Sequence, residues 1–405
     1  MRAFVRYDNK GIIVPTSFVM KNTMPKVGQW KEISTSKSVS GFPAQSSQKN
    51  LRAFVRYNGK NKVVPGSVVV RGQVPSGNFS EVTYDLSRPI STGYVFLTKA
   101  ELSIAIDIWS FDRETALENY GEINTWVTTN ITDMSSLFNS NLDFNSDISN
   151  WDVSNVIDMS RMFSGRRSSF NQPLNNWDVG SVTDMSEMFA DTPFNQPIGN
   201  WDVSNVTTME SMFRQTPFDQ DISSWNVSNV TDMSHMFSSA RDFNQPIGDW
   251  NVSNVTDMEE MFIFTNSFNQ PIGDWDVSSV TNMYYMFNNA DAFNQPIGNW
   301  DVSNVTNMYG MFRNVDSFDQ SIGNWNVSSV TDMGTMFSSA NDFNQDISNW
   351  NVSSVNNMTQ MFLNAISYNQ DLSIWDVDNV VACNAFSQGA TSWTLPKPTF
   401  TNCTP

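Results

Sequence analysis

The chain has 405 residues, of which 40% are hydrophobic and 16% charged, and its formal net charge is −18. Because no apolar run approaches the roughly 20 residues of a membrane-spanning helix, the composition predicts a folded protein without membrane insertion. Residues 1–125 hold 16 Lys and Arg against 10 Asp and Glu, whereas residues 126–405 hold 7 against 31, so the long acidic part is expected to repel nucleic acid and anionic lipid.

The first 85 residues contain a two-fold repeat. Arg2–Tyr7 returns as Arg52–Tyr57, and Val14–Val19 returns with changes as Val64–Val69. Polar turns separate these β-branched runs, which is typical of hairpins. Each copy is therefore predicted to form a small β module. The Ser-, Lys- and Gln-rich stretch between the copies is predicted to be a flexible linker.

Two helices are predicted before the main repeat. Thr98 and Glu101 have the spacing of a capping box, and apolar residues at helical spacing continue to Trp109. A second short helix is expected from about Arg113 and should end at Gly121, because glycine commonly follows a helix C-terminus. We expect these helices to cap the repeat, since the terminal unit of a stack has one unpaired face.

A unit of about 25 residues repeats through the rest of the chain. Residues 194–209 show its frame, Phe-Asn-Gln-Pro-Ile-Gly-Asn-Trp-Asp-Val-Ser-Asn-Val-Thr-Thr-Met. This period lies within the 20–29 residues of leucine-rich-type repeats, whose single units bury their apolar side only by stacking on neighbours. The units are marked by the tryptophans Trp126, Trp151, Trp177, Trp201, Trp225, Trp250, Trp275, Trp300, Trp325, Trp350 and Trp375.

Two patterns predict the local structure of each unit. Ile198, Trp201 and Val203 have the spacing of a leucine-rich-repeat strand. Val206 to Phe213 place apolar residues on one face of about two helical turns. We therefore predict a short strand, a turn, a short helix and a return loop. The alternative is a strand centred on Phe-Asn-Gln-x-Ile, which ranks second because the prolines that recur there remove a donor from a sheet.

The two cysteines, Cys383 and Cys403, lie at the C-terminal end of the sequence. Cys383 occupies the position that Met358 and Met333 hold in earlier units, so it is expected to point into the core. A disulfide to Cys403 would hold the tail over the open end of the last unit and contribute roughly 3 kcal/mol. If reduced, Cys383 would pack as a small core residue.

The predicted fold class is an α/β repeat: a leucine-rich-repeat-like, right-handed solenoid of about eleven 25-residue coils. It has a helical N-cap and a disulfide-clipped C-cap, and two small β modules precede it. The predicted segments are a β module at 1–33, a linker at 34–50, a second β module at 51–85, a helical cap at 86–125, the solenoid at 126–382 and a C-terminal cap at 383–405.

The unit Trp-Asp-Val-Ser-Asn-Val-Thr-Asp-Met-Ser-x-Met-Phe, present at residues 225–237 with Asn for Asp, resembles the repeat of BspA-like surface proteins of bacteria, protists and some viruses. The resemblance covers about residues 97–405, from the lead-in helix to the closing Phe400–Pro405. It implies a fold similar to leucine-rich repeats and a role in adhesion and recognition, with no catalytic residues to transfer. The N-terminal modules resemble, less closely, short modules at the start of phage virion proteins.

The candidate ligand site is a strip of Asp and Asn side chains directly before and after the tryptophans. Ladders of carboxylate and amide groups bind sugar hydroxyls or collect Ca²⁺ through oxygen ligands. The alternative is that they hydrogen-bond their own turns and neighbouring coils. The candidate residues are Asp202, Asp249, Asp274, Asp276, Asn299 and Asp301.

Other columns indicate structure and not chemistry. Met233, Met236 and Phe237 are predicted to belong to a core stripe, and Phe-Asn-Gln segments such as 243–245 to a buried Phe stack with an Asn ladder. The single histidine, His235, takes a variable position that is expected to be exposed. No nucleophile–base pair, metal-ligand spacing or phosphate loop is present, so no enzyme, no resident metal and no cofactor is expected apart from Ca²⁺ on the strip.

These features together predict a non-enzymatic virion structural and adhesion protein of a bacteriophage. The N-terminal modules would bind other virion proteins, and the acidic solenoid would face outward to bind a host-surface protein or glycan. The start of the sequence lacks the pattern of a signal peptide, which favours a virion-surface component released by lysis. The alternatives are a BspA-like adhesin on a bacterial cell surface and a polysaccharide depolymerase.

Overall fold

The computed structural model of the chain divides into two compact units, Met1–Ser91 and Thr92–Pro405. Each is described by itself. In the second unit the structure describes nearly every residue, and in the first it describes only the strands. The described residues are 2–7, 19–21, 29–32, 52–56, 69–71, 79–82, 93–166 and 168–405.

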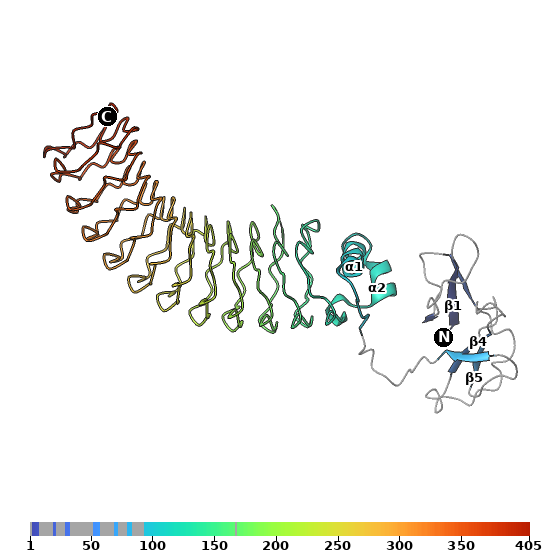
Figure 1. The fold of residues 1–405 in the computed structure, drawn as a ribbon. Helices are drawn as coiled ribbons and strands as arrows, with labels where there is room; N and C mark the ends of the chain where they lie inside the picture. The colour runs from blue at the N-terminus through green and yellow to red at the C-terminus, as the bar shows by residue number, and fades with distance from the viewer. Residues whose placement is uncertain are drawn as a thin grey trace. The chain divides into compact units, whose positions relative to one another are not determined.

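The first unit contains two small antiparallel sheets with the same strand order. The strands β1 and β4 are central, and each pairs with the two later strands of its own copy, giving the orders β2-β1-β3 and β5-β4-β6 (Figure 1). Phe4 is opposite Val19 and Glu32, and Phe54, fifty positions later, is opposite Val69 and Glu81. The strands are β1 Arg2–Tyr7, β2 Val19–Lys21, β3 Gln29–Glu32, β4 Arg52–Arg56, β5 Val69–Arg71 and β6 Phe79–Val82.

The duplicated sequence is therefore a duplicated sheet. Both central strands contain the pair Phe-Val, two residue types that strands favour. The predicted linker at 34–50 and the predicted turns lie outside the described residues.

The second unit begins with the two expected helices, α1 (Lys99–Phe111) and α2 (Arg113–Tyr120). The Thr98 side chain accepts a hydrogen bond from the Glu101 backbone N–H at 3.2 Å, which satisfies one of the N–H groups that a helix start leaves free. Gly121 ends α2 with a φ of 78°, a left-handed conformation that glycine adopts without a steric penalty. The helix predictions from the capping box and from Gly121 are confirmed.

Helix α1 covers the open face of the first coil. Its buried side chains, among them Leu102 and Trp109, join the same apolar core as the coils. The Trp109 Nε1–H donates to the Ser146 hydroxyl at 2.9 Å, and the Lys99 ammonium donates to Asp133 Oδ1 at 2.7 Å. The cap thus closes the stack with apolar burial and with polar contacts at its rim.

Beyond α2 and a single 3₁₀ turn at Ile123–Thr125, the chain runs as a stack of coils that follows a gentle curve (Figure 1). One isolated parallel bridge joins each coil to the next. The bridged residues are Asp133, Asp158, Asp184, Thr208, Asp232, Asp257, Asn282, Asn307, Asp332, Asn357 and Ala382.

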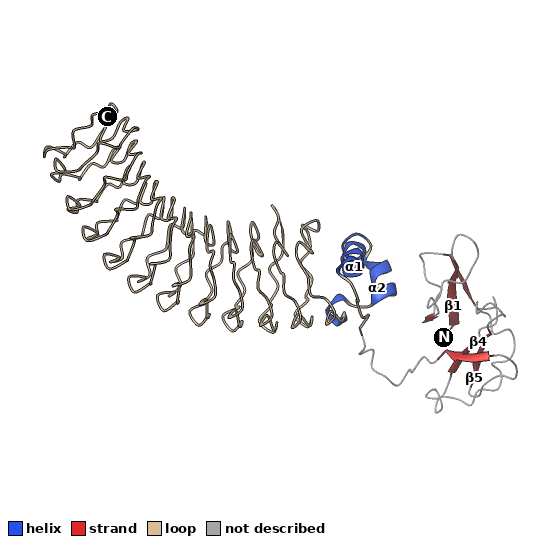
Figure 2. Cartoon of the chain, in the orientation of Figure 1, coloured by secondary structure: helices blue, strands red, loops and turns tan. Residues whose placement is uncertain are grey.

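The strand and the helix predicted within each coil are not formed in the described residues after Thr125, which are turns and loops (Figure 2). The bridge falls at Thr208 and its equivalents, and neither at Trp201 nor in the Phe-Asn-Gln segment. A two-turn helix would leave most of its terminal N–H and C=O groups without partners. Contacts between coils satisfy them instead, which local periodicity does not reveal.

Alternate peptides between Met209 and Gln215 bond to the next coil. The Ser211 N–H donates to the Ser234 carbonyl and the Phe213 N–H to the Met236 carbonyl, both at 2.9 Å. This requires left-handed backbone at two positions in each coil from Glu187 onward, with φ of 54° at Ser211 and 56° at Gln215, and at one position in the two coils before. Such residues cost about 1 kcal/mol each, and the hydrogen bonds between coils offset that cost.

Aromatic columns fill the interior. Trp225 and Trp250 stack with ring centroids 6.4 Å apart, and Phe213 and Phe218 pack at 4.0 Å within one coil. The methionine column is buried as predicted, with Met233 fully buried. From Trp151 to Trp375 each Trp indole of the column also donates to a backbone carbonyl one unit earlier, so the buried polar atom of the ring is satisfied.

A polar ladder runs beside the Phe column. The Asn195 Oδ1 accepts from the Asp219 backbone N–H at 3.0 Å and from the Gln220 side-chain amide at 2.9 Å. The same contact recurs one coil later, where Asp219 takes the place of Asn195. The prediction that Phe-Asn-Gln combines a buried Phe stack with an Asn ladder is confirmed.

The last coil is closed by the C-terminal tail. Cys383 is buried and forms a disulfide with Cys403, with their Cα atoms 5.8 Å apart. The Trp393 Nε1–H donates to the Gln370 carbonyl at 2.9 Å, and Phe400 lies against Phe386. Aromatic side chains of the tail thereby cover the apolar face that a further coil would cover.

Within the described residues, no helix has both the length and the apolar character needed to cross a membrane.

Candidate binding surface

The predicted strip lies on exposed positions on both sides of the buried tryptophan column. All six predicted residues are exposed. Five of them belong to the three consecutive coils of Trp250, Trp275 and Trp300, whereas Asp202 lies two coils earlier than Trp250. The carboxylates of Asp276 and Asp301 are near enough to influence each other electrostatically. The structure therefore gathers five of the six predicted residues on adjacent coils.

The aspartates that follow a tryptophan also hold their own turns. Oδ1 of Asp202, Asp276 and Asp301 accepts the backbone N–H two residues later, at 3.0, 3.1 and 3.1 Å. Serine hydrogen bonds to the charged carboxylate lower the pKa of each of these three groups. One oxygen of each carboxylate is thus used structurally, as the second interpretation of the strip expected.

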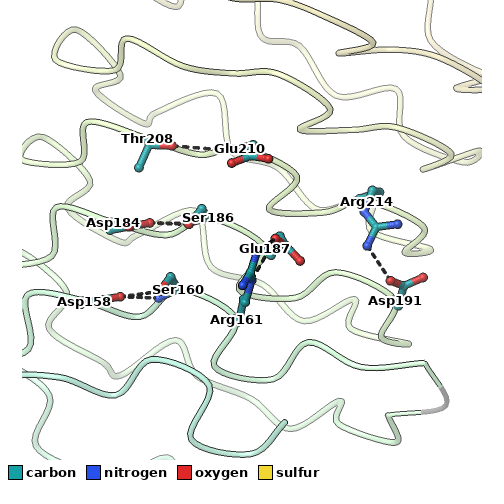
Figure 3. A network of polar contacts seen from close by, with 10 residues as sticks. All are labelled: Asp158, Ser160, Arg161, Asp184, Ser186, Glu187, Asp191, Thr208, Glu210 and Arg214. Atoms are coloured by element: carbon teal, nitrogen blue, oxygen red, sulfur yellow. Dashed lines mark hydrogen bonds and ion pairs between the residues drawn. The ribbon is translucent and has the colours of Figure 1, made fainter.

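A second candidate surface lies at the two residues between the methionines of each Met-x-x-Met-Phe segment, with Leu137 replacing the second methionine in the first coil and Cys383 and Phe386 flanking the pair in the last. We call these two positions the outer pair. The side chain at the bridge position fixes where the pair starts: Asp158 Oδ1 accepts from the Ser160 N–H at 2.8 Å and from its hydroxyl at 2.7 Å (Figure 3). The second residue of each pair is left-handed. Most of these side chains are half-buried or exposed, whereas the flanking methionines are buried; the buried exceptions in the pairs are Ser211, Ser234, Gly310, Gly334 and Thr335.

The outer pair changes from coil to coil while the residues around it repeat. Sequence reasoning placed it on a helix and did not consider it as a binding surface. The sequence does contain a signal for this surface, because the two positions vary while the residues on both sides of them repeat. The pairs are Ser135-Ser136, Ser160-Arg161, Ser186-Glu187, Glu210-Ser211, Ser234-His235, Glu259-Glu260, Tyr284-Tyr285, Tyr309-Gly310, Gly334-Thr335, Thr359-Gln360 and Asn384-Ala385.

Ion pairs connect coils at the N-terminal part of this surface. Arg161 pairs with Glu187 at 2.6 Å, and Arg214, just beyond the outer pair, pairs with Asp191 at 2.7 Å (Figure 3). The Arg161–Glu187 pair is the more exposed of the two, and a solvent-exposed pair contributes less than about 1 kcal/mol. Both ion pairs set the surface charge there and neutralise two carboxylates.

An acidic group follows in the middle coils. The ring of His235 lies between Glu259 and Glu260, with its Nδ1 3.2 Å from a Glu260 oxygen. That hydrogen bond to Glu260 raises the pKa of His235 despite partial burial, and the charge of Glu210 adds to the effect. The expectation that His235 is exposed is wrong: its side chain is half-buried, because the neighbouring coil flanks it.

Three tyrosines form the next part of the surface. The rings of Tyr284 and Tyr309 stack with centroids 5.4 Å apart, and Tyr285 meets both edge-on, at 4.4 and 5.2 Å. Burial raises the pKa of Tyr284 and Tyr309, so both hydroxyls are protonated at neutral pH. An aromatic platform of this kind suits binding better than proton transfer.

Among the described residues, no group of three or more His, Cys, Asp or Glu side chains has the arrangement of a metal site. The carboxylates of the coils lie singly or in pairs along columns.

Three segments of the chain match one family model, described as Mycoplasma protein of unknown function, DUF285. They are residues 108–217, 191–300 and 291–397, which together run from the end of α1 to the C-terminal tail. No curated protein and no solved structure matches the chain. The chain belongs to the DUF285 family and carries three successive matches to it.

Proposed function

We propose that the coils form a leucine-rich-repeat-like, right-handed solenoid of BspA-like type whose function is recognition without catalysis. The observation that carries this proposal is the contrast between a repeated core and changing outer pairs on one frame. Stacked repeats provide long surfaces on which positions outside the core are free to differ, and such surfaces serve binding. The ligand would be a protein or glycan on a host surface, with Ca²⁺ as an optional cofactor at the strip.

The chain's location is proposed to be a virion surface, with the N-terminal sheets attached to other virion proteins. The charge difference between the two parts of the sequence supports different partners for them. The family description, a Mycoplasma protein, instead favours the second candidate, an adhesin on a cell surface. Mass spectrometry of purified particles separates the two, because detection in particles supports the first and detection only in cell-envelope fractions supports the second.

Binding of the labelled full-length chain to host cells, with and without Ca²⁺, tests the proposed recognition. The paired substitution Asp276→Ala with Asp301→Ala removes two neighbouring carboxylates of the strip. Loss of binding would assign the ligand to the strip, and retained binding would assign it to another surface such as the outer pairs. A chain that binds no host surface, glycan or protein under either condition contradicts the proposal.

A further inference from the structure

Tyrosine is an exception in the outer pairs. Serine occupies the first position of the pair in four coils, as Ser135, Ser160, Ser186 and Ser234, and the other coils without tyrosine there hold Glu, Thr, Asn or Gly. Tyrosine occupies these positions in two successive coils, as Tyr284 and Tyr285 in one and Tyr309 in the next. Tyrosines account for much of the binding energy in protein interfaces, because they provide a large contact area at a low entropic cost.

Two glycines make room for these rings. A Cβ added to Gly310 would collide with the Tyr285 ring, and one added to Gly334 would lie 2.6 Å from the Tyr309 ring. Gly310 has a φ of 63°, but non-glycine residues adopt the same conformation at the equivalent position of ten other coils. The backbone therefore does not require glycine at 310. The Tyr285 ring instead fills the space that a side chain at residue 310 would occupy. The absence of a side chain there thus helps to fix the orientation of the ring.

A carboxylate pair adjoins the tyrosines on their N-terminal side. The Glu260 backbone N–H donates to the Tyr284 carbonyl at 2.8 Å, so Tyr284 and Tyr285 follow Glu259 and Glu260 at the equivalent positions of the next coil. Asn282 donates to Glu259 at 2.9 Å. Within the described part of the chain, the cationic partner of both carboxylates is His235 and neither pairs with Lys or Arg. The two carboxylates therefore precede the tyrosines on the adjacent coil without a Lys or Arg partner among the described residues.

We propose that Tyr284, Tyr285 and Tyr309, with Glu259 and Glu260, bind a lysine or arginine side chain in a basic polypeptide segment of a partner. Cations are attracted to the faces of tyrosine rings, and the carboxylates add charge complementarity. The Arg313 guanidinium donates to the Tyr285 hydroxyl at 3.4 Å, so a guanidinium group already lies at the edge of the cluster, where it contacts the hydroxyl oxygen. The strongly acidic residues 126–405 would steer such a partner toward the coils.

A neutral sugar would also stack on the rings and donate its hydroxyls to the carboxylates, but it lacks the positive charge that Glu259 and Glu260 attract. The inference deepens the proposed recognition function and rests on it. It assigns that function to one surface and one ligand chemistry.

The test uses the full-length chain and a short peptide of lysine and arginine, titrated by calorimetry at physiological ionic strength. Tyr284→Ser with Tyr309→Ser leaves the net charge unchanged and introduces the residue that other coils already hold. We expect the dissociation constant to rise about tenfold, as the loss of two cation–aromatic contacts implies. Circular dichroism and the melting temperature establish that the variant is folded. Gly310→Ala provides a second variant, which displaces the Tyr285 ring without removing a tyrosine.

A charge control separates the site from general attraction. Glu259→Gln with Glu260→Gln should weaken the peptide about fivefold. Glu114→Gln with Glu118→Gln, the same charge change on exposed positions of α2, should change it less than about twofold. Equal losses in the two pairs, or unchanged binding in the serine variant, overturns the site.

A neutral oligosaccharide that binds in a tyrosine-dependent manner while the peptide does not bind also overturns it. The two proposals can fail separately. If the serine variant keeps both its affinity for the peptide and its binding to host surfaces, the tyrosine site is wrong and the recognition function stands. If the intact chain binds no host surface, the proposed function fails independently.

Discussion

The inward-facing columns and the outer pairs of the coils follow opposite rules. Ten coils place an aromatic residue in the column that runs from Phe144 to Tyr368, and nine of these residues are Phe. The outer pairs hold Ser, Arg, Glu, His, Tyr, Gly, Thr, Gln, Asn and Ala. Both kinds of position lie within the same 25-residue unit, whose backbone conformation repeats from coil to coil.

The difference shows what stacking constrains. An interior ring has an identical ring above and below it, so a change at one coil removes contacts from two others. Most outer positions are half-buried or exposed, and their backbone hydrogen bonds do not depend on the side chain. Invariance within the repeat therefore marks packing, and variation marks the surface that is free to be selected for binding.

The most severe test breaks an interior column. Phe287→Ala removes a buried ring that packs on Phe293 at 4.0 Å and on the rings of both neighbouring coils at 5.6 and 5.8 Å. We expect the free energy of unfolding to fall by about 3–5 kcal/mol, measured by urea denaturation with tryptophan fluorescence. Ile366→Asn is the control, because Ile366 is exposed where other coils have Asp or Asn, and it should change stability by less than about 0.5 kcal/mol. Similar losses in both variants would contradict the packing argument.

The second test removes the disulfide that holds the C-terminal tail over the last coil. Cys403→Ala opens a loop closed across 20 residues and should cost about 3 kcal/mol. Because repeats contact only their neighbours, the loss should be concentrated in the last coils and be visible as faster hydrogen exchange there. Uniformly faster exchange as far as α1 would show that the stack unfolds as one unit instead.

The third test addresses the polar ladder. Asn195→Ala leaves the Asp219 N–H and the Gln220 amide without their acceptor and should cost about 1–2 kcal/mol. Asn195→Asp keeps an oxygen at this position, as Asp219 and Asp319 do in their own coils, and should cost clearly less. Thermal denaturation of the two variants in parallel measures the difference, and an equal loss would exclude the acceptor role.

A smaller, stabilising effect is expected from a substitution at Tyr368, the tyrosine in a column that otherwise holds Phe. The Tyr368 hydroxyl is buried without a hydrogen-bond partner in the described residues, and burial raises its pKa strongly. Tyr368→Phe restores the residue of the other coils and should stabilise the chain by about 1 kcal/mol. A lower melting temperature for this variant would show that the hydroxyl is satisfied in solution.

The smallest effect should come from an outer residue. The pKa of His235 is raised by Glu260, so its contribution to stability is fully present below the unfolded value of about 6.5 and is lost as the pH rises through the folded pKa. The difference in stability between the wild type and His235→Gln should shrink over that range by no more than about 1 kcal/mol. Chemical denaturation at a series of pH values measures it, and a pH-independent difference would contradict the ion pair.

The sequence by itself determined the repeat, its period, the buried columns, the cap helices and the ladder, because each depends on residue type at fixed spacing. Thr98 and Gly121 specify helix ends locally, and the identical Trp, Met and Phe positions are buried only when units stack in register. Five of the six strip residues chosen from the sequence lie on the exposed side of three adjacent coils.

Only the tertiary structure decided the backbone of the coil. The spacing from Val206 to Phe213 fits a helix, but hydrogen bonds to the next coil compete with helical ones and replace them, and no local pattern encodes that competition. The outer pairs, the half-burial of His235 and the fit of Tyr285 over Gly310 follow from that backbone. They bring together residues 25 positions apart, which a sequence pattern marks as equivalent but does not show to be in contact.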